Sequence, residues 1–313
     1  MNKHYLGIDT SNYTSSISVI NESDQILLDQ RIILDVPLGK SGLRQQEAVF
    51  QHLINIPKLI ESINIDVNCF DTVSVSSKPR QIEGSYMPVF KVGVSFAEVI
   101  SKINKIPIKY FSHQEGHIAS IIYENNIYED AFVSFHFSGG TTEIILVKNS
   151  DNLYTTLIGG TNDISFGQLI DRIGVYTGLK FPCGEKMEKI ACLGSLLKLD
   201  LPKPQNTTWI NLSGLENFYK RLIDSKKYNI EDIFYTLFIN ISYFIENMVI
   251  KTIEIQNTST VLIVGGVSTN NIIRNYLSNN NYRIKIYYSK TNLSSDNAVG
   301  VGFLGKYKRG WED

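Results

Sequence analysis

Two of the five histidines in this chain, His113 and His117, lie four residues apart in the sequence F-S-H-Q-E-G-H-I-A-S. On a helix this spacing places both imidazoles on one face, one turn apart. Two neutral imidazoles can hold a divalent transition metal when a third ligand comes from another part of the chain. The same spacing also arises by chance on a solvated or helix-capping face, so a metal site requires a third ligand.

An acidic residue near the C-terminus, Asp296, is a candidate for that third ligand. It precedes an apolar helix-forming stretch in the sequence S-S-D-N-A-V-G-V-G, so its alternative role is that of a helix N-cap. With both histidines it would form a His–His–Asp site with open coordination positions, and an open-sided ion can polarise a phosphate or carbonyl oxygen. Glu115 lies between the histidines and could support the site, but we expect its side chain to face solvent.

Two glycine turns are candidate anion-binding features. The sequence S-G-G-T-T at residues 138–142 joins two predicted strands, and its backbone N–H groups could approach a phosphate. The alternative is a tight hairpin that needs positive φ at the glycines. A second turn, Gly265-Gly266, leads from a strand into a helix whose N-terminus presents N–H groups. Asn270 at that helix start is expected either to cap the helix or to reach a nucleoside.

Two common nucleotide-binding patterns are absent from the sequence. It contains neither the G-x-G-x-x-G pattern of Rossmann dinucleotide sites nor the G-x-x-x-x-G-K-[ST] pattern of P-loops. The glycine turns therefore favour a different kind of nucleotide cleft, formed between two halves of the chain.

A strand–turn–strand unit occurs at the start of each half. Residues 5–20 and 131–147 both read as two β-rich runs joined by a turn of Ser, Thr, Gly or Asn. A unit repeated at the heads of two halves of similar size predicts a duplicated α/β domain.

Apolar periodicity and turn residues predict the remaining elements. We expect helices at residues 45–63, 92–103, 166–178, 230–255, 270–277 and 296–306. We expect further strands at residues 70–76, 106–111, 260–264 and 284–288, and an exposed loop at residues 199–208.

The composition indicates a soluble globular protein. Of 313 residues, 43% are hydrophobic and 19% are charged, and the net charge of −1 argues against extensive RNA binding without a partner. Three cysteines without a C-x-x-C spacing argue against a disulfide framework. We find no signal-peptide core and expect no apolar run of membrane-spanning length, so we predict a cytoplasmic protein without membrane contact.

Taken together, these segments resemble the TsaD-type tRNA threonylcarbamoyladenosine synthases, a family formerly described as glycoproteases or O-sialoglycoprotein endopeptidases. The resemblance covers almost the whole chain and keeps the order of the family's motifs. The sequences L-G-I-D-T-S, H-Q-E-G-H, F-S-G-G-T-T-E and G-G-V-S-T-N are similar to L-G-I-E-T-S, H-M-E-G-H, V-S-G-G-H-T-Q and G-G-V-S-x-N. The sequences G-Q-L-I-D, F-P-C-G, L-S-G-L and S-D-N resemble G-E-A-F-D, Y-P-G-G, F-S-G-L and T-D-N.

The resemblance implies an α/β protein with the actin, sugar-kinase and chaperone-ATPase fold. In that fold two duplicated RNase H-like lobes surround a nucleotide cleft. We expect an N-terminal lobe of residues 1–130 plus 296–313, which carries the metal ligands. Residues 131–295 would form a C-terminal lobe with the nucleotide-binding turns.

The resemblance also implies an activity and a ligand set. The family transfers a threonylcarbamoyl group from threonylcarbamoyl-AMP to the exocyclic amine of the adenosine beside the tRNA anticodon, and works with protein partners of a threonylcarbamoylation complex. By this resemblance His113, His117 and Asp296 would hold one divalent metal ion, iron or zinc. An adenylate, an adenine-nucleotide ligand, would be held by His136, Phe137, Ser138, Gly139, Gly140, Asp171, Gly184 and Asn270. Such a transfer needs no covalent nucleophile, so no catalytic side chain is assigned.

The chain departs from the family's pattern at four places. The acidic turn C-D-E-T is replaced by N-Y-T-S at residues 12–15, and the G-P-G loop by S-K-P-R at residues 77–80. Thr141 replaces the histidine after the Gly-Gly turn, and Glu216 replaces the lysine after S-G-L.

These departures leave three functions open. The protein is either a working threonylcarbamoyltransferase or a metal- and nucleotide-binding paralogue with another acceptor or an assembly role. A metalloprotease is a weaker alternative, because the glutamate that follows the first histidine in H-E-x-x-H is absent.

Overall fold

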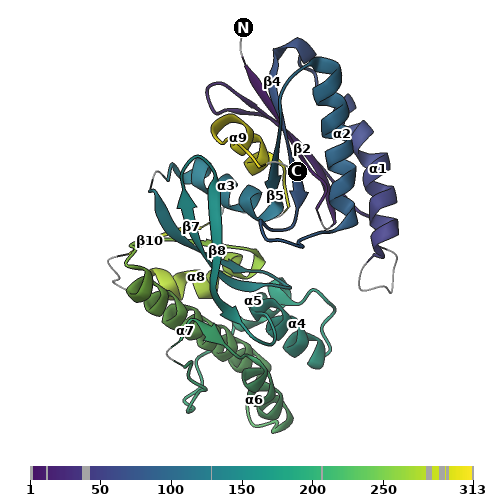
Figure 1. Cartoon of the computed structure of the whole chain (residues 1–313). Helices are drawn as coiled ribbons and strands as arrows, with labels where there is room; N and C mark the ends of the chain where they lie inside the picture. The colour runs from purple at the N-terminus through teal and green to yellow at the C-terminus, as the bar shows by residue number, and fades with distance from the viewer. Residues whose placement is uncertain are drawn as a thin grey trace. The chain divides into compact units, whose positions relative to one another are not determined.

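The computed structural model describes residues 3–11, 13–36, 43–127, 129–205, 207–279, 284–288, 293 and 296–311. The chain forms two compact units (Figure 1). Unit 1 comprises Met1–Asp130, Lys148–Thr155 and Asn292–Asp313, and unit 2 comprises Ala131–Val147 and Thr156–Thr291. The C-terminal segment therefore belongs to the same unit as the N-terminal strands.

Unit 1 contains a five-stranded sheet of order β3-β2-β1-β4-β5. Strands β1 and β2 form the predicted first strand–turn–strand unit and pair antiparallel, as do β2 and β3, whereas β1, β4 and β5 are parallel. The strands are β1 (His4–Asp9), β2 (Thr14–Asn21), β3 (Ile26–Ile33), β4 (Phe70–Lys78) and β5 (Ile108–Ser112). Because parallel strands end at one edge of a sheet, Asp9 and Ser112 mark the same edge.

Helices cover both faces of this sheet. Helices α1 (Gln45–Glu61) and α2 (Pro88–Asn104) pack on each other and on β2 and β4, and α9 (Val299–Tyr307) packs on β1 and β4 from the other side (Figure 1). The alternation of side chains along β1 explains this arrangement. Leu6 and Ile8 join the core beneath α1 and α2, and Gly7 between them faces α9.

Helix α9 also contacts α3 (His113–Asn125) at very short range, and small residues make this possible. A Cβ atom on Gly300 would lie 1.8 Å from the carbonyl oxygen of Gly116. A Cβ atom on Gly302 would lie 2.8 Å from the Ser18 hydroxyl oxygen on the sheet. Glycine is therefore required where α9 passes between α3 and β2.

Unit 2 contains a six-stranded sheet of order β11-β10-β6-β7-β8-β9. Strand β10 pairs parallel with both β6 and β11. The strands are β6 (Ala131–Phe137), β7 (Thr142–Asn149), β8 (Leu153–Thr161), β9 (Trp209–Ile210), β10 (Thr260–Val264) and β11 (Lys285–Tyr288). The order β8-β7-β6-β10-β11 repeats the order β3-β2-β1-β4-β5, which confirms the predicted duplicated α/β fold.

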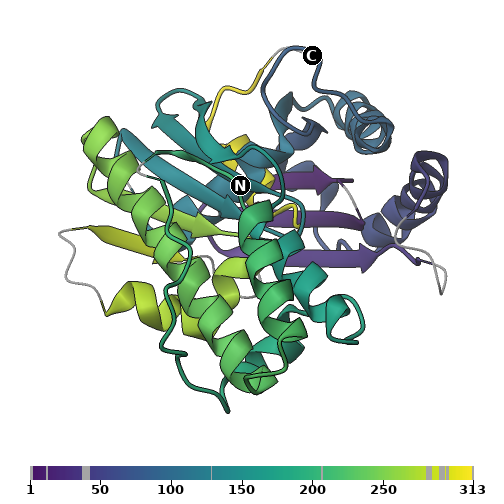
Figure 2. The ribbon, with the colours of Figure 1, turned by 90° about the horizontal axis from the view of Figure 1, so that it is seen from below.

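The core of unit 2 is built around one long helix, α7 (Ile230–Gln256) (Figure 2). It packs against α5 (Gly184–Ala191), α6 (Ser213–Asp224) and α8 (Asn271–Ser278). In the described part of the chain α7 is long and apolar enough to cross a membrane, so our expectation that no apolar run reaches that length is wrong. Two-thirds of its most apolar stretch is buried inside the protein. Phe234 and Leu237, for example, are fully buried, as in the core helix of a globular protein.

The other elements of unit 2 are shorter. The helices are α4 (Phe166–Tyr176), α5 (Gly184–Ala191), α6 (Ser213–Asp224) and α8 (Asn271–Ser278). Helices α5 and α6, like strands β3 and β8, have no counterpart among the segments we predicted individually. The predicted last helix begins three residues later than expected, at Val299, with Ala298 as its N-cap. The side chain of Asn297 accepts a hydrogen bond from the Val299 N–H.

Candidate functional site

The histidine pair lies at the start of α3, directly after β5. Ser112 caps this helix: its hydroxyl oxygen accepts a hydrogen bond from the Glu115 N–H, and the Glu115 carboxylate accepts one from the Ser112 N–H. This reciprocal capping box fixes the first turn of the helix. His113 and His117 therefore stand on one helix face, with their ring centroids 4.3 Å apart.

The carboxylate of Glu115 is fully buried, so our expectation that it faces solvent is wrong. It accepts hydrogen bonds from the Ser112 N–H and hydroxyl at 2.7 Å and from the Trp311 indole N–H at 2.8 Å. Burial raises the pKa of Glu115, and these hydrogen bonds oppose that rise. The sequence around Glu115 does not indicate this burial, because the residue that covers the carboxylate, Trp311, comes from the C-terminal segment. The Trp311 backbone N–H bonds to the Tyr110 carbonyl and so holds that segment beside β5. Glu115 thus holds the start of α3.

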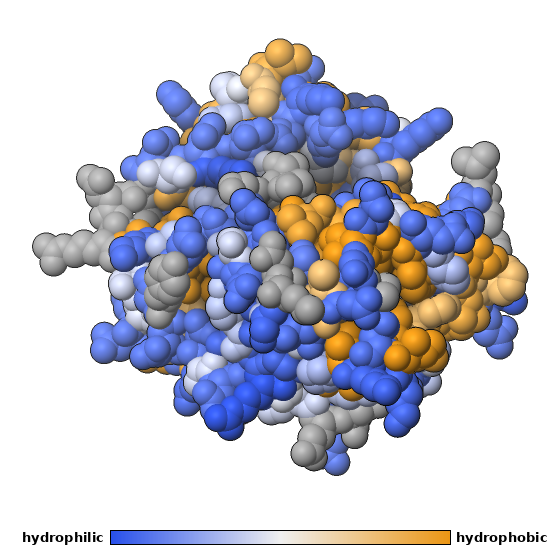
Figure 3. Space-filling model, turned by 90° about the horizontal axis from the view of Figure 1, so that it is seen from above, coloured by the Kyte–Doolittle hydropathy of each residue, from blue (hydrophilic) through white to orange (hydrophobic). Residues whose placement is uncertain are grey.

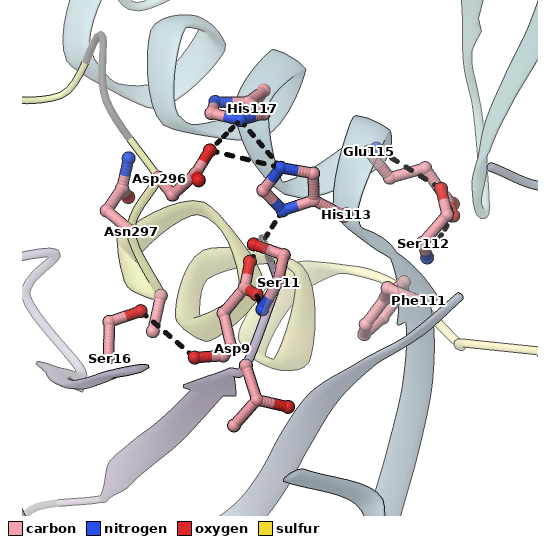
Figure 4. A network of polar contacts seen from close by, with 12 residues as sticks. Asp9, Ser11, Ser16, Phe111, Ser112, His113, Glu115, His117, Asp296 and Asn297 are labelled. Carbon is pink, nitrogen blue, oxygen red and sulfur yellow. Dashed lines mark hydrogen bonds and ion pairs between the residues drawn. The ribbon is translucent and has the colours of Figure 1, made fainter. Parts of the chain in front are cut away.

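Asp296 reaches the histidines from the segment before α9 (Figure 4). It is not the N-cap of this helix, and its carboxylate points to the imidazoles. Its Oδ1 atom lies 3.3 Å from His113 Nε2 and 3.2 Å from His117 Nε2. The serines that precede it in the S-S-D-N sequence, residues 294 and 295, lie outside the described residues.

The geometry of this three-residue cluster fits a divalent metal ion. The two Nε2 atoms are 2.9 Å apart, and the three ligand atoms lie within 4.8 Å of one another. Metal–ligand bonds of about 2.1 Å place neighbouring donors of a tetrahedral site about 3.4 Å apart. The side chains of His113, His117 and Asp296 keep 13%, 13% and 22% of their surface exposed, so the cluster can be reached from outside.

A fourth residue, Asp9, orients the cluster from the end of β1. Its Oδ2 atom lies 2.8 Å from His113 Nδ1, and its Oδ1 atom accepts a hydrogen bond from the Ser11 N–H at 2.7 Å (Figure 4). A carboxylate at Nδ1 keeps the proton on that nitrogen and leaves the lone pair on Nε2 for a metal. We did not assign Asp9 from the sequence. Its signal is its place at the carboxyl end of β1, at the same sheet edge as the end of β5.

The charges of this cluster shift its pKa values. Burial lowers the pKa of His113, but the charges of Asp9 and Asp296 and the hydrogen bonds to them outweigh burial and raise it to about 10. Burial would raise the pKa of Asp296, but hydrogen bonds to His113 and His117 hold it well below its usual range. The carboxylates therefore favour positive charge at the imidazole face, which a metal cation can supply in place of a proton.

Among the described residues of the turn between β1 and β2, which are residues 10, 11 and 13, none carries a carboxylate. Residues 14 and 15, which follow the turn, carry none either, and Asn12 lies outside the described residues. Ser15 is buried instead against α1. Its hydroxyl oxygen lies 2.8 Å from His52 Nδ1 and 3.3 Å from the Asn55 amide nitrogen. The last residue of the N-Y-T-S segment, Ser15, therefore makes a buried polar contact.

The Gly-Gly turn of unit 2 is closed by Ser138 and Thr141. The Ser138 N–H bonds to the Thr141 carbonyl at 2.9 Å, and the Thr141 N–H bonds to the Ser138 hydroxyl at 3.0 Å. Gly139 and Gly140 do not have positive φ, so that proposed reason for the glycines is wrong. The tight contact is at Gly167, where a Cβ atom would lie 2.4 Å from the Ser138 carbonyl oxygen. The N-terminus of α4 thus packs directly on the turn.

A cavity of about 810 Å³ adjoins this turn within unit 2. Its size suits a small ligand such as a nucleotide. It is lined by four residues of the predicted adenylate set, Gly139, Asp171, Gly184 and Asn270. The N-terminus of α5 at Gly184 and the start of α8 both line the cavity. One glycine turn and two helix N-termini, which can bind anions, therefore border it.

The other four residues of the predicted set do not line this cavity. Phe137 is fully buried, and its ring packs at 5.3 Å on Phe166 in the core. His136, Ser138 and Gly140 belong to the end of β6 and the turn.

Two of the lining side chains already have partners inside unit 2. Asn270 accepts a hydrogen bond from the Ile273 N–H, so it caps α8 and also lines the cavity. Asp171 accepts a hydrogen bond from the Cys183 N–H, and burial raises its pKa.

Comparison with known proteins gives this architecture and site a family. The family model described as TsaD, tRNA N6-adenosine threonylcarbamoyltransferase, matches residues 43–303. Curated relatives of the same description occur in Prochlorococcus marinus (strain AS9601; 26% identity, 98% of this chain and 91% of the relative) and Nanoarchaeum equitans (26% identity, 96% and 93%).

Solved structures share the fold. The structure of HypF from T. kodakarensis has a TM-score of 0.63 at 14% identity, over 97% of this chain and 47% of HypF. Component A of the Acidaminococcus fermentans (R)-2-hydroxyglutaryl-CoA dehydratase has a TM-score of 0.56 at 14% identity, over 97% of both chains. These likenesses confirm the predicted actin-like ATPase fold. The match to most of the chain shows that it belongs to the TsaD family of tRNA N6-adenosine threonylcarbamoyltransferases.

Proposed function

We propose that this protein transfers a threonylcarbamoyl group from threonylcarbamoyl-AMP to the exocyclic amine of the adenosine next to the tRNA anticodon. Family membership supports threonylcarbamoyl transfer to tRNA. The observation that carries the metal-dependent part of the proposal is the convergence of His113, His117 and Asp296 from two distant segments at metal-ligand spacing. The metal in this proposal is one divalent ion, iron or zinc.

The residues of unit 1 would prepare the metal site. Asp9 keeps the proton on His113 Nδ1, so that Nε2 faces the ion as a neutral donor. Asp296 adds the negative charge that favours a divalent cation. When bound, the ion would neutralise charge on the phosphate of the donor and help to orient it.

The residues of unit 2 would hold the adenylate. Backbone N–H groups at Gly139 and at the α5 N-terminus suit phosphate oxygens, and Asp171 and Asn270 offer polar atoms for the nucleoside.

The amine of the acceptor attacks the carbamoyl carbon, the bond from that carbon to the phosphate oxygen breaks, and AMP and a proton are released. The reaction depends on positioning and charge neutralisation, without a covalent intermediate on the protein.

A second function remains as an alternative proposal: a metal- and nucleotide-binding paralogue with another acceptor or an assembly role. The observation that favours it is that Tyr13 and Thr14 stand where the C-D-E-T turn of the family carries its two acids. The metalloprotease alternative gains no support, because Glu115 is fully buried and bonded to Ser112 and Trp311, and so is not placed to act as a base on a metal-bound water.

Protein partners are part of this proposal, and an exposed apolar surface on unit 1 supports them. Figure 3 shows hydrophobic side chains gathered on the side where α1 and α2 lie. Large apolar residues are exposed on both helices: Phe50, Leu53, Ile54, Val99 and Ile103. Such a patch on two adjacent helices is typical of a protein interface. We place the complex in the cytoplasm, where tRNA is found.

The test uses purified protein with threonylcarbamoyl-AMP and unmodified tRNA, with and without the partner proteins. The modified nucleoside is measured by mass spectrometry. We expect product from the metal-loaded protein and none from His113→Ala or Asp296→Ala, which should lose their metal. Asp200→Ala, which removes an exposed carboxylate far from the cluster in sequence, is the matched control.

Two outcomes would contradict the proposal. Metal-loaded protein that gives no product with any combination of partners would exclude the transfer activity. Full metal content in both His113→Ala and Asp296→Ala would exclude the three-ligand site.

A further inference from the structure

A second cavity in unit 2, of about 690 Å³, lies between α4 and α6 and has no assigned ligand. Arg172 and Tyr176 of α4 face Glu216 and Lys220 of α6 across it. We call it the α4–α6 groove. Three residues of the first cavity, Gly139, Asp171 and Phe181, line the groove as well. The two cavities are therefore adjacent.

The groove exposes apolar and aromatic surface. Phe181 is 70% exposed, Val175 is 51% exposed and Tyr176 is 45% exposed. The Tyr176 ring is held in place by a hydrogen bond from its hydroxyl to Asp224 at 2.8 Å. The Lys220 ammonium lies over one face of this ring, 5.4 Å from its centroid. The other face of a ring that is fixed in this way can stack on a flat ligand at little entropic cost.

The groove also carries two basic side chains, Arg172 on α4 and Lys220 on α6. The nearly buried carboxylate of Glu216 bonds to Arg172 at 3.1 Å and to Lys220 at 2.5 Å. Burial would raise the pKa of Glu216, but the two cations hold it below its usual value, so the carboxylate stays charged. With Asp171, the lining residues carry two cations and two carboxylates, and half of the Arg172 side chain is exposed to a ligand.

We propose that the α4–α6 groove binds an unpaired nucleobase of the acceptor RNA. The base stacks on Tyr176 and Phe181, and the neighbouring backbone phosphate contacts Arg172 and Lys220. Aromatic rings and guanidinium planes are the groups that proteins use to hold unpaired bases, and basic side chains beside them neutralise the phosphates. This inference rests on the proposed transfer to RNA.

The position of the groove suits this role. Arg172, Tyr176, Glu216 and Lys220 line the groove but not the first cavity, so they are not needed by an adenylate bound there. Because Gly139 and Asp171 border both cavities, a base in the groove would lie beside the proposed donor site. The replacement of a family lysine by Glu216 is then explained, since its carboxylate fixes Arg172 and Lys220 at the groove.

The test measures RNA binding separately from transfer. An anticodon stem-loop RNA with 2-aminopurine in its loop is titrated with metal-loaded protein, and quenching of the fluorescent base reports stacking. We expect Tyr176→Leu to weaken binding by about 5- to 100-fold. Tyr176→Phe keeps the ring but loses the hydrogen bond to Asp224, so it should bind the RNA more tightly than Tyr176→Leu does.

A second variant tests the phosphate contact. Arg172→Gln should weaken binding at low salt and reduce the slope of log affinity against log salt by about one. Arg309→Gln, which removes an 80% exposed arginine from unit 1, is its control. AMP affinity, measured by calorimetry, should stay unchanged in all four variants.

The outcomes separate this inference from the proposed function. Product formation with no quenching, or with equal quenching in Tyr176→Leu, would overturn the groove assignment and leave the transfer activity intact. Quenching that depends on Tyr176, in protein that forms no product, would support the groove assignment and contradict the transfer activity. Loss of AMP affinity in Tyr176→Leu and Arg172→Gln would overturn the inference by assigning the groove to the adenylate.

Discussion

Units 1 and 2 share one order of sheet strands but use the end of the first strand differently. In unit 1, β1 ends at Asp9, whose side chain orients His113. In unit 2, the corresponding strand β6 leads into the Ser138–Thr141 turn, where backbone groups face a cavity. The same scaffold therefore supports a cluster of charged side chains in one copy and a cavity beside a glycine turn and two helix N-termini in the other.

This difference predicts different sensitivities to substitution. The proposed metal site needs three side chains from two segments at separations near 3 Å, so a small displacement of one helix would disrupt it. The cavity of unit 2 spans about 810 Å³ and has many lining groups, so the loss of one contact should weaken a ligand without abolishing its binding. Four substitutions test this contrast.

The largest effect is expected for Gly300→Ala. The new methyl group would lie 1.8 Å from the Gly116 carbonyl oxygen, so α9 must move away from α3 and carry Asp296 away from the histidines. We expect more than 100-fold weaker metal binding and a loss of about 1–3 kcal/mol in the free energy of unfolding. Zinc titration and thermal unfolding measure the two effects.

The control for this substitution is Gly214→Ala in α6, where an added Cβ atom has no neighbour within 4 Å. It should leave metal affinity and stability unchanged. Normal metal affinity in Gly300→Ala would show that the α3–α9 contact does not set the ligand spacing.

A smaller effect is expected for Asp9→Asn. The amide oxygen can still accept a hydrogen bond from His113 Nδ1, but the negative charge is lost. Loss of such an outer carboxylate typically weakens metal binding by about 10- to 100-fold. Competition with a chromogenic zinc chelator measures the affinity, and Asp71→Asn, which breaks a surface ion pair with Lys3, is the control. Equal affinities in both variants would exclude Asp9 from the site.

The convergence of His113, His117 and Asp296 could be predicted from the sequence, but the contacts that hold these side chains in place could not. The spacing of His113 and His117 appears within five residues, and Asp296 stands out next to a glycine-rich helix. Asp9 and Trp311 reach the cluster only through the parallel pairing of β1, β4 and β5 and the return of the C-terminus. No local pattern encodes those contacts, and for this reason our solvent-exposed assignment of Glu115 failed.

The duplicated fold was predictable because both strand–turn–strand units have the same pattern of β-rich runs and polar turn residues. The roles of the glycines were harder to predict. We placed the constraint at Gly139 and Gly140, whereas the close contact is at Gly167 on the facing helix. Sequence patterns show where the backbone can bend, but only packing shows where two backbones meet.

In unit 2, Gly167→Ala should weaken adenylate binding by about 10-fold, in line with the cost of an overpacked contact. The added methyl group would lie 2.4 Å from the Ser138 carbonyl oxygen and would push α4 off the turn beside the cavity. AMP affinity measured by calorimetry tests this expectation, and metal affinity should not change. A change in metal affinity as large as that in AMP affinity would contradict the independence of the two units.

The smallest effect on the metal site is expected for Trp311→Phe. The aromatic ring remains against Tyr154, but the hydrogen bond to the buried Glu115 carboxylate is lost. An unpartnered oxygen on a buried charged group costs about 1.5–3 kcal/mol, which should appear in the free energy of unfolding. Metal affinity should fall only by about 2- to 5-fold, because Ser112 still holds the other carboxylate oxygen and fixes the first turn of α3. A loss of metal affinity as large as that of Asp9→Asn would mean that the C-terminal segment, and not the capping box, positions the histidines.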